Sequence, residues 1–168
     1  MLTIGICEDN ASDREHLQDM VSHILFARED VYIKLYKDSQ ELLSALEQHQ
    51  MDCNLLLLDI HMPKPNGMEL AHELRRRQTD VDIIFITHSQ EHIFEGYTCK
   101  AFAYILKPFT KERLAEELNR YLDELESTSE CLNINVQGMK RRIALSEILY
   151  LESAGRKVTI HTKREDVE

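Results

Sequence analysis

Short apolar runs alternate with longer segments of helical periodicity through the first three quarters of this sequence. Several of the runs are apolar at every position, as in strands that are covered on both faces. Between them, apolar residues recur at the helical period, as in the stripe from Leu17 to Leu25. This alternation favours an α/β fold with a parallel sheet. The expected strands are Leu2–Cys7, Val31–Tyr36, Cys53–Leu58, Ile83–Ile86 and Phe102–Leu106.

The sequence changes character after Glu126. Leu132, Ile134 and Val136 alternate strictly with polar residues, which is typical of a strand with one exposed face. Further short strands are expected over residues 142–145, 148–151 and 157–162. The sequence therefore predicts a first domain over residues 1–126, a polar linker over 127–130 and an all-β segment over 131–168. The last segment is expected to be incomplete, because about 40 residues rarely form a self-sufficient domain.

Charge is unevenly distributed along the chain, whose net charge is −10. Residues 1–126 hold 13 basic and 24 acidic side chains, whereas residues 127–168 hold 7 and 6. Bulk electrostatics therefore exclude the first part as a nucleic-acid binder. Contact with nucleic-acid phosphates is expected only in the tail, through Lys140-Arg141-Arg142 and Arg156-Lys157.

Composition also restricts where the protein works. No segment approaches the roughly 20 consecutive apolar residues that span a bilayer, and the N-terminus leads into an expected strand rather than a cleavable signal. We therefore expect a cytoplasmic protein without membrane contact. Its four cysteines lie far apart without metal-binding spacing, so they are expected as buried or half-buried thiols.

The carboxyl ends of the expected strands carry a group of charged and polar residues. In a parallel α/β sheet, ligands bind outside these strand ends. Glu8 and Asp9 follow the first strand, and Asp59 follows the third. Thr87 follows the fourth strand, and Lys107 follows the fifth. We expect these five side chains to face one pocket.

Carboxylates gathered at one sheet edge repel each other unless a cation lies between them, and Mg²⁺ prefers oxygen ligands. The sequence therefore predicts a magnesium site in which Asp9 and Asp59 bind directly and Glu8 binds through water. The backbone carbonyl of Ile60 is expected as a further ligand.

A magnesium ion at this place would prepare Asp59 to act as a nucleophile toward a phosphoryl donor, because the metal neutralises the charge of the transferred group. The Thr87 hydroxyl is expected to donate a hydrogen bond to one phosphoryl oxygen. The Lys107 ammonium is expected to pair with another.

Four segments resemble the characteristic blocks of the two-component receiver domain. They are Ile6–Asn10, Leu57–Pro63, Thr87 and Tyr104–Phe109. The resemblance covers residues 1–126 and implies a flavodoxin-like, doubly wound five-stranded sheet of order 2-1-3-4-5. It also implies a sensor histidine kinase as the phosphoryl donor, and a homodimer on phosphorylation is common among relatives. By the same resemblance, Tyr104 swings inward with Thr87 on phosphorylation, and His61 and Ser89 lie where the family sets how fast water removes the phosphoryl group.

The tail resembles the opening strands of a LytTR-type DNA-binding domain over residues 143–153 and 158–162. This resemblance implies a response regulator that controls transcription. Arg156 and Lys157 lie where an early DNA-contacting loop is expected, and phosphate contact is their expected role. The chain alone is expected to bind DNA weakly or not at all, because later segments of such a domain are missing from it.

Two other functions fit parts of the pattern. A metal-dependent phosphotransfer enzyme acting on a small molecule would need a second catalytic acid beside Asp59, and the sequence offers none. A binding-only module would lack Asp59 or Lys107, and both are present. We therefore expect a regulatory phosphoacceptor rather than an enzyme with a free substrate.

Overall fold

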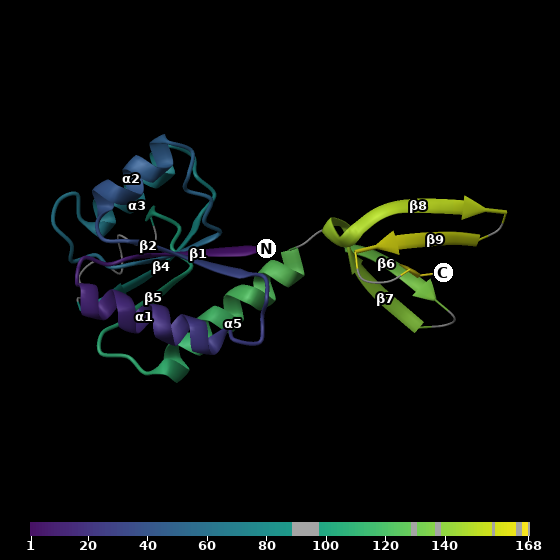
Figure 1. The fold of residues 1–168 in the computed structure, drawn as a ribbon, viewed down its shortest axis with the longest axis horizontal. Coiled ribbons are helices and arrows are strands. Elements are labelled where there is room, and N and C mark those ends of the chain that lie inside the picture. Colours follow the sequence, from purple (N-terminus) through teal and green to yellow (C-terminus); the bar gives the residue numbers. More distant parts are fainter. Residues whose placement is uncertain (89–97, 129–130, 137–138, 156, 164–165, 168) are drawn as a thin grey trace. The chain divides into compact units, whose positions relative to one another are not determined.

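The computed structural model describes residues 1–88, 98–128, 131–136, 139–155, 157–163 and 166–167. The chain forms two compact units, Met1–Leu118 and Asn119–Glu168 (Figure 1). Among the described helices, none has both the length and the apolar composition needed to cross a bilayer.

The first unit contains a five-stranded parallel sheet of order β2-β1-β3-β4-β5. Its strands are β1 (Leu2–Cys7), β2 (Val31–Tyr36), β3 (Leu55–Leu58), β4 (Asp82–Thr87) and β5 (Ala103–Leu106). The described helices are α1 (Ala11–Ile24), α2 (Ser39–Glu47), α3 (Gly67–Arg76) and α5 (Lys111–Thr128). The predicted α/β fold and strand order are confirmed.

The predicted strands differ from the observed ones mainly at β3, which begins at Leu55 rather than Cys53. At its start, the Asn54 side-chain oxygen accepts a hydrogen bond from the Thr3 amide at 2.8 Å. The Asn54 amide also donates to the Thr3 carbonyl at 2.8 Å, so Asn54 is joined to β1 although the strand itself begins two residues later than predicted. The end of β3, which positions Asp59, is where the sequence predicts it.

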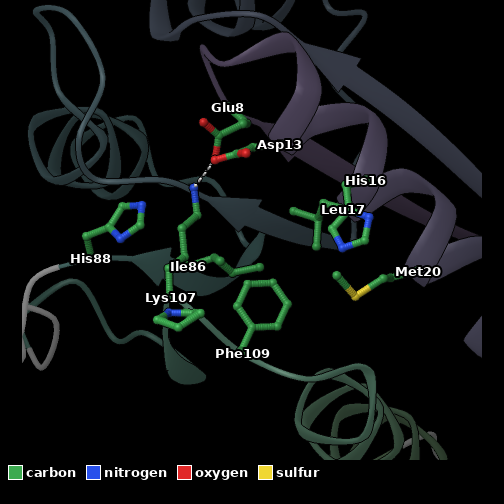
Figure 2. A pocket seen from close by; sticks show the side chains of 10 residues that line it. Glu8, Asp13, His16, Leu17, Met20, Ile86, His88, Lys107 and Phe109 are labelled. Atoms are coloured by element: carbon green, nitrogen blue, oxygen red, sulfur yellow. Dashed lines mark hydrogen bonds and ion pairs between the residues drawn. The ribbon is translucent and has the colours of Figure 1, made fainter.

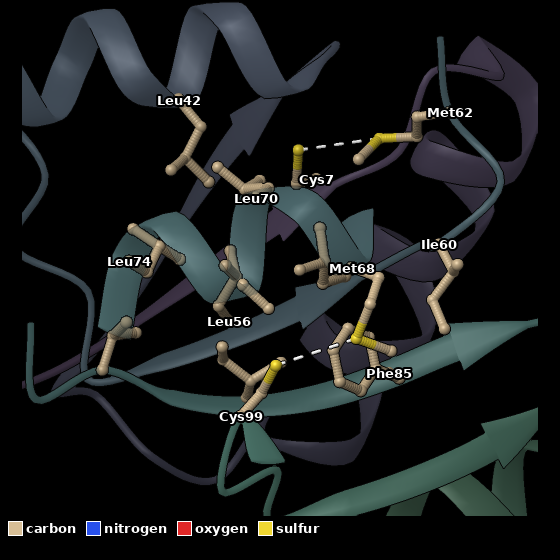
Figure 3. Close-up of a cluster of buried hydrophobic side chains, with 14 of the residues drawn as sticks. Cys7, Leu42, Leu56, Ile60, Met62, Met68, Leu70, Leu74, Phe85 and Cys99 are labelled. Carbon is tan, nitrogen blue, oxygen red and sulfur yellow. Dashed lines mark hydrogen bonds between the residues drawn. The ribbon is translucent and has the colours of Figure 1, made fainter. Parts of the chain in front are cut away.

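Helices cover both faces of the sheet, with α1 and α5 on one side and α2 and α3 on the other (Figure 1). Every residue of β1 and β3 is buried, which explains why these runs are apolar apart from Thr3. Figure 3 shows Leu70 and Leu74 of α3 above Leu56 and Phe85 of the sheet, within one buried cluster. This close-packed layer holds the ends of β1 and β3 in fixed positions.

Side-chain caps set the beginnings of the helices that border the site. Asn10 accepts hydrogen bonds from the amides of Ser12 and Asp13 at the start of α1. Asn66 and Glu69 form a reciprocal capping box at the start of α3. Each cap satisfies amide groups that the first helical turn leaves without a partner.

The second unit is built from antiparallel strands. They are β6 (Cys131–Val136), β7 (Met139–Ala144), β8 (Ile148–Ala154), β9 (Lys157–Thr162) and β10 (Asp166–Val167). β6 pairs with β7, and β8, β9 and β10 form a second sheet. Ile143, Ile160 and Val167 form its small buried cluster, to which alternate residues of β6 add partly buried side chains.

The boundary between the two predicted domains falls inside a helix in the structure. α5 continues through Thr128, so Ser127 and Thr128 are helical, whereas they were expected in the polar linker over residues 127–130. Serine and threonine are weak helix formers rather than helix breakers, and the helix extends over them.

Candidate functional site

Three carboxylates meet at the carboxyl edge of the sheet, as predicted from their places after β1 and β3. Oxygen atoms of Glu8, Asp9 and Asp59 all lie within 4.8 Å of one another. Glu8 and Asp59 are only 3% and 5% exposed, whereas Asp9 is exposed. Two buried carboxylates beside a solvent-facing one form a negatively charged pocket that is open on one side.

Lys107, just past β5, supplies the positive charge in this pocket. Its Nζ lies 2.6 Å from Glu8 Oε2 and 2.9 Å from Asp59 Oδ2. Burial alone would lower the pKa of Lys107, but the hydrogen bonds to the two carboxylates outweigh it and raise this pKa above its usual range. Burial also raises the pKa of Glu8, although Lys107 opposes the shift. The ammonium is therefore firmly charged, and burial favours the protonated form of Glu8.

A fourth carboxylate, Asp13, was not among the predicted site residues. Its Oδ2 lies 3.3 Å from Lys107 Nζ, and its side chain projects from the first turn of α1. Figure 2 shows Asp13 beside Glu8, facing the Lys107 ammonium. Its place in the first helical turn, three residues after the Asn10 cap, was the signal that could have identified it.

Backbone groups hold Asp59 from the other side. The His61 amide donates a hydrogen bond to Asp59 Oδ1 at 2.9 Å. A Cβ atom on Gly67 would lie 2.0 Å from the Asp59 carbonyl oxygen, so only glycine allows α3 to begin this close to Asp59. The turn after β3 and the start of α3 therefore form one tightly packed support.

The same support argues against one expected metal ligand. The carbonyl oxygen of Ile60 accepts hydrogen bonds from the amides of Met62 and Gly67, each at 3.0 Å. A carbonyl oxygen has two lone pairs, and both are used here. We therefore leave the Ile60 carbonyl out of the candidate metal ligands.

Thr87 ends β4 and is fully buried. Its carbonyl accepts a hydrogen bond from the Lys107 amide at 2.8 Å, which joins the ends of β4 and β5. Its hydroxyl Oγ1 lies 2.9 Å from Nδ1 of His61. No sequence pattern indicated this contact, which joins side chains 26 residues apart.

Tyr104, the expected switch residue, lies in β5 and is partly buried. Its ring packs against Phe85 at a centroid distance of 5.3 Å, with the ring planes tilted by 42°. Tyr104 thus lies over the α2–α3 face of the sheet, beside the strand that carries Thr87.

A cavity of about 250 Å³ opens beside the carboxylates. Figure 2 shows Lys107 and His88 at one end and Leu17, Met20 and Phe109 at the other. The cavity joins the charged pocket to an apolar surface between α1 and the segment after β5.

Of the predicted DNA-contacting pair, Lys157 is exposed at the start of β9, whereas Arg156 lies outside the described residues. Ser89, which was expected to affect how fast water removes the phosphoryl group, also lies outside them. The cysteines that the structure describes as free thiols are Cys7, Cys53 and Cys99.

Comparisons of the sequence with known proteins give consistent matches. The family model of the response regulator receiver domain matches residues 4–119. The chain is 32% identical to the transcriptional regulatory protein NatR of Bacillus subtilis, over all of this chain and 71% of NatR. It is 30% identical to the sensory transduction protein LytT of Oceanobacillus iheyensis, over 94% of this chain and 65% of LytT.

A solved structure gives the same result. The crystal structure of response regulator protein TrrA from Thermotoga maritima, in complex with Mg²⁺-BeF, superposes with a TM-score of 0.60 and 26% identity. The superposition covers 71% of this chain and 98% of the TrrA chain. This chain and TrrA therefore share a fold.

Proposed function

This chain belongs to the response regulator receiver family, and from that membership we propose that Asp59 is its phosphoacceptor. The family is regulatory rather than metabolic, and it operates in two-component signalling. The observation that carries the proposal is the placement of Asp59, which is buried, next to two further carboxylates and 2.9 Å from the Lys107 ammonium. We propose a sensor histidine kinase as the phosphoryl donor.

The donor set fits a magnesium ion. Mg²⁺ binds carboxylate oxygens at about 2.0–2.1 Å and keeps several waters. Oxygen atoms within 4.8 Å of one another lie near the spacing that one ion needs, so we propose Asp9 and Asp59 as direct ligands, with Glu8 acting through water. When bound, the ion neutralises charge on the transferred group. The Mg²⁺-BeF complex of TrrA supports this assignment, since TrrA shares the fold.

The side chains of Asp59, Lys107 and Thr87 have different proposed roles in the phosphoryl transfer. An Asp59 carboxylate oxygen attacks phosphorus and forms a P–O bond, while the bond to the donor breaks and the leaving group departs with the electron pair. The Lys107 ammonium and the Thr87 hydroxyl then contact phosphoryl oxygens. Tyr104 follows the change at Thr87, because the two residues lie on adjacent strands.

The output proposed for this signal is control of transcription. NatR is named a transcriptional regulatory protein, and its match extends through residues 127–168. We propose that this part belongs to a LytTR-type DNA-binding domain, with Lys157 and Arg156 as phosphate contacts and a homodimer formed on phosphorylation. A cytoplasmic location is part of the same proposal, and the free thiols suit a reducing compartment.

Incubation with acetyl phosphate and Mg²⁺ tests the proposal. Intact-mass spectra are expected to show one added phosphoryl group that is stable in acid and labile in base. Asp59→Asn should lose this adduct, whereas Asp52→Asn should keep it, because Asp52 is exposed and pairs with Lys34 away from the site. An unmodified wild-type chain, or an adduct that survives Asp59→Asn, would refute Asp59 as the acceptor.

A further inference from the structure

We infer that Met68, His72 and Cys99 form a second metal site, which binds one soft monovalent ion, Cu(I). Met68 and His72 lie on α3, and Cys99 lies in the segment before β5. The carboxylate pocket offers hard oxygen ligands, whereas these three side chains offer a thioether, an imidazole and a thiol. The two sites therefore suit different ions, and this inference is independent of the phosphoacceptor proposal.

The donor atoms lie at the spacing that one ion requires. Cys99 Sγ lies 3.7 Å from Met68 Sδ and 3.5 Å from His72 Nδ1. Figure 3 shows the sulfur atoms of Cys99 and Met68 facing each other. First-row metal ions such as zinc bind sulfur at about 2.3 Å and nitrogen at about 2.0–2.1 Å, so three ligands spread evenly around one ion lie roughly 3.5–4.0 Å apart. Both distances from Cys99 Sγ fit such an arrangement.

The fold brings the three ligands together before any ion binds. Met68 and His72 are four residues apart on α3, so they lie on one face of the helix. Arg75, about one turn further along α3, donates from Nε to the Cys99 carbonyl at 2.6 Å. This hydrogen bond ties the backbone of Cys99 to the helix that carries the other two ligands. Binding therefore requires little rearrangement of the backbone.

Burial and charge select the kind of ion. Cys99 is fully buried and Met68 is 4% exposed, whereas His72 is exposed and gives entry from solvent. Binding breaks the thiol S–H bond, forms a metal–sulfur bond and releases the proton to water. A thiolate with Cu(I) carries no net charge and can stay buried, whereas a divalent ion would leave a positive charge in an apolar core. Zinc sites use cysteine, histidine and carboxylates, so the thioether also favours Cu(I).

The imidazole can serve as a ligand whichever tautomer it adopts beforehand. A neutral imidazole carries one proton, on Nδ1 or on Nε2. Because the ring of His72 is exposed, it can exchange this proton with water. When Nδ1 binds the ion, the proton lies on Nε2. The metal-bound state is therefore the same for both tautomers, and for either direction of the contact with Cys99.

Competition for Cu(I) with the chelator bicinchoninate, under argon and with ascorbate as the reductant, tests the inference on the full chain. The wild type is expected to withdraw one Cu(I) per chain from the coloured complex, and Cys99→Ser should lose this uptake. Groups that only orient metal ligands already change affinity roughly 10- to 100-fold, so His72→Ala and Met68→Leu should each weaken binding at least roughly 10-fold. His72 is exposed, so its replacement leaves the packing of the core intact.

Met62→Leu is the matched control for Met68→Leu. Met62 Sδ lies 3.8 Å from Cys7 Sγ and both residues are buried, so this change removes the same kind of sulfur contact elsewhere in the core. It should leave the affinity for Cu(I) unchanged. Wild-type uptake no greater than that of Cys99→Ser, wild-type affinity in His72→Ala, or equal losses in Met62→Leu and Met68→Leu would each overturn the inference.

Discussion

Replacing Lys107 by methionine is expected to destabilise the receiver domain by about 3–4 kcal/mol at pH 7. Methionine keeps much of the length of the lysine stem but leaves Glu8 and Asp59 without the cation that lies 2.6 and 2.9 Å from them. The two carboxylate side chains are 4% and 5% exposed, so water screens little of the repulsion that remains. Breaking such a buried pair typically costs about 3–5 kcal/mol.

Protonation of Glu8 limits this loss. Placing a proton on a carboxyl of unfolded pKa about 4.3 costs about 3.7 kcal/mol at pH 7 and about 1.6 kcal/mol at pH 5.5. Burial and the charge of Asp59 already raise the pKa of Glu8, and the variant loses the opposing effect of Lys107. A carboxyl group whose pKa is higher in the folded than in the unfolded protein stabilises the fold at pH values below the unfolded pKa. This stabilisation is lost as the pH rises through the folded pKa. The defect should therefore shrink to about 2 kcal/mol at pH 5.5.

Urea unfolding followed by far-UV circular dichroism measures both values, because α1, α2, α3 and α5 contribute a helical signal that is lost on unfolding. Lys34→Met is the matched control, since Lys34 and its partner Asp52 both face solvent, and it should change the free energy of unfolding far less. A Lys107→Met loss below about 1 kcal/mol at pH 7, or a loss that grows as the pH falls to 5.5, would refute this account of the pocket.

Three further predictions concern the site and the core beneath it. Gly67→Ala should cost about 1–3 kcal/mol and weaken calorimetric Mg²⁺ binding, because the new Cβ meets backbone of Asp59 at 2.0 Å. Gly5→Ala should leave Mg²⁺ binding intact, since its nearest neighbours are side-chain atoms. Leu74→Ala, at a fully buried position, should cost about 2–5 kcal/mol in urea unfolding, whereas Leu149→Ala, at a 59% exposed position, should be near neutral. Mg²⁺ at about 100 times its dissociation constant should add about 2.7 kcal/mol to the stability of the wild type and clearly less to Asp59→Asn; equal gains in both proteins would contradict Asp59 as a ligand.

The location of the pocket could be predicted because local patterns decide it. Apolar runs locate the strands, and the parallel topology brings Glu8, Asp59 and Lys107 to one edge whatever the helices do. The contact between His61 and Thr87 could not be predicted in this way, because it depends on side-chain rotamers of residues 26 positions apart. Local patterns say little about such rotamers.

The hydrogen bonds at the Ile60 carbonyl could not be predicted for a related reason. A backbone carbonyl next to Asp59 is a reasonable metal ligand as long as nothing else occupies it. Whether it is free depends on how closely α3 begins, which is set by Gly67 and by the turn through Met62. The need for glycine at position 67 is explained only by the spatial proximity of the Asp59 carbonyl.

Two different bonds at Thr87 explain how a small chemical change at Asp59 can be detected without rebuilding the fold. The carbonyl of Thr87 is tied to the Lys107 amide at 2.8 Å, and the strand that ends there is buried along most of its length. The backbone is therefore fixed, and only the hydroxyl has a choice of partner. A charged phosphoryl oxygen on Asp59 would be a strong acceptor for this hydroxyl, so the hydroxyl can change its hydrogen bonds while the strand that carries it stays in place.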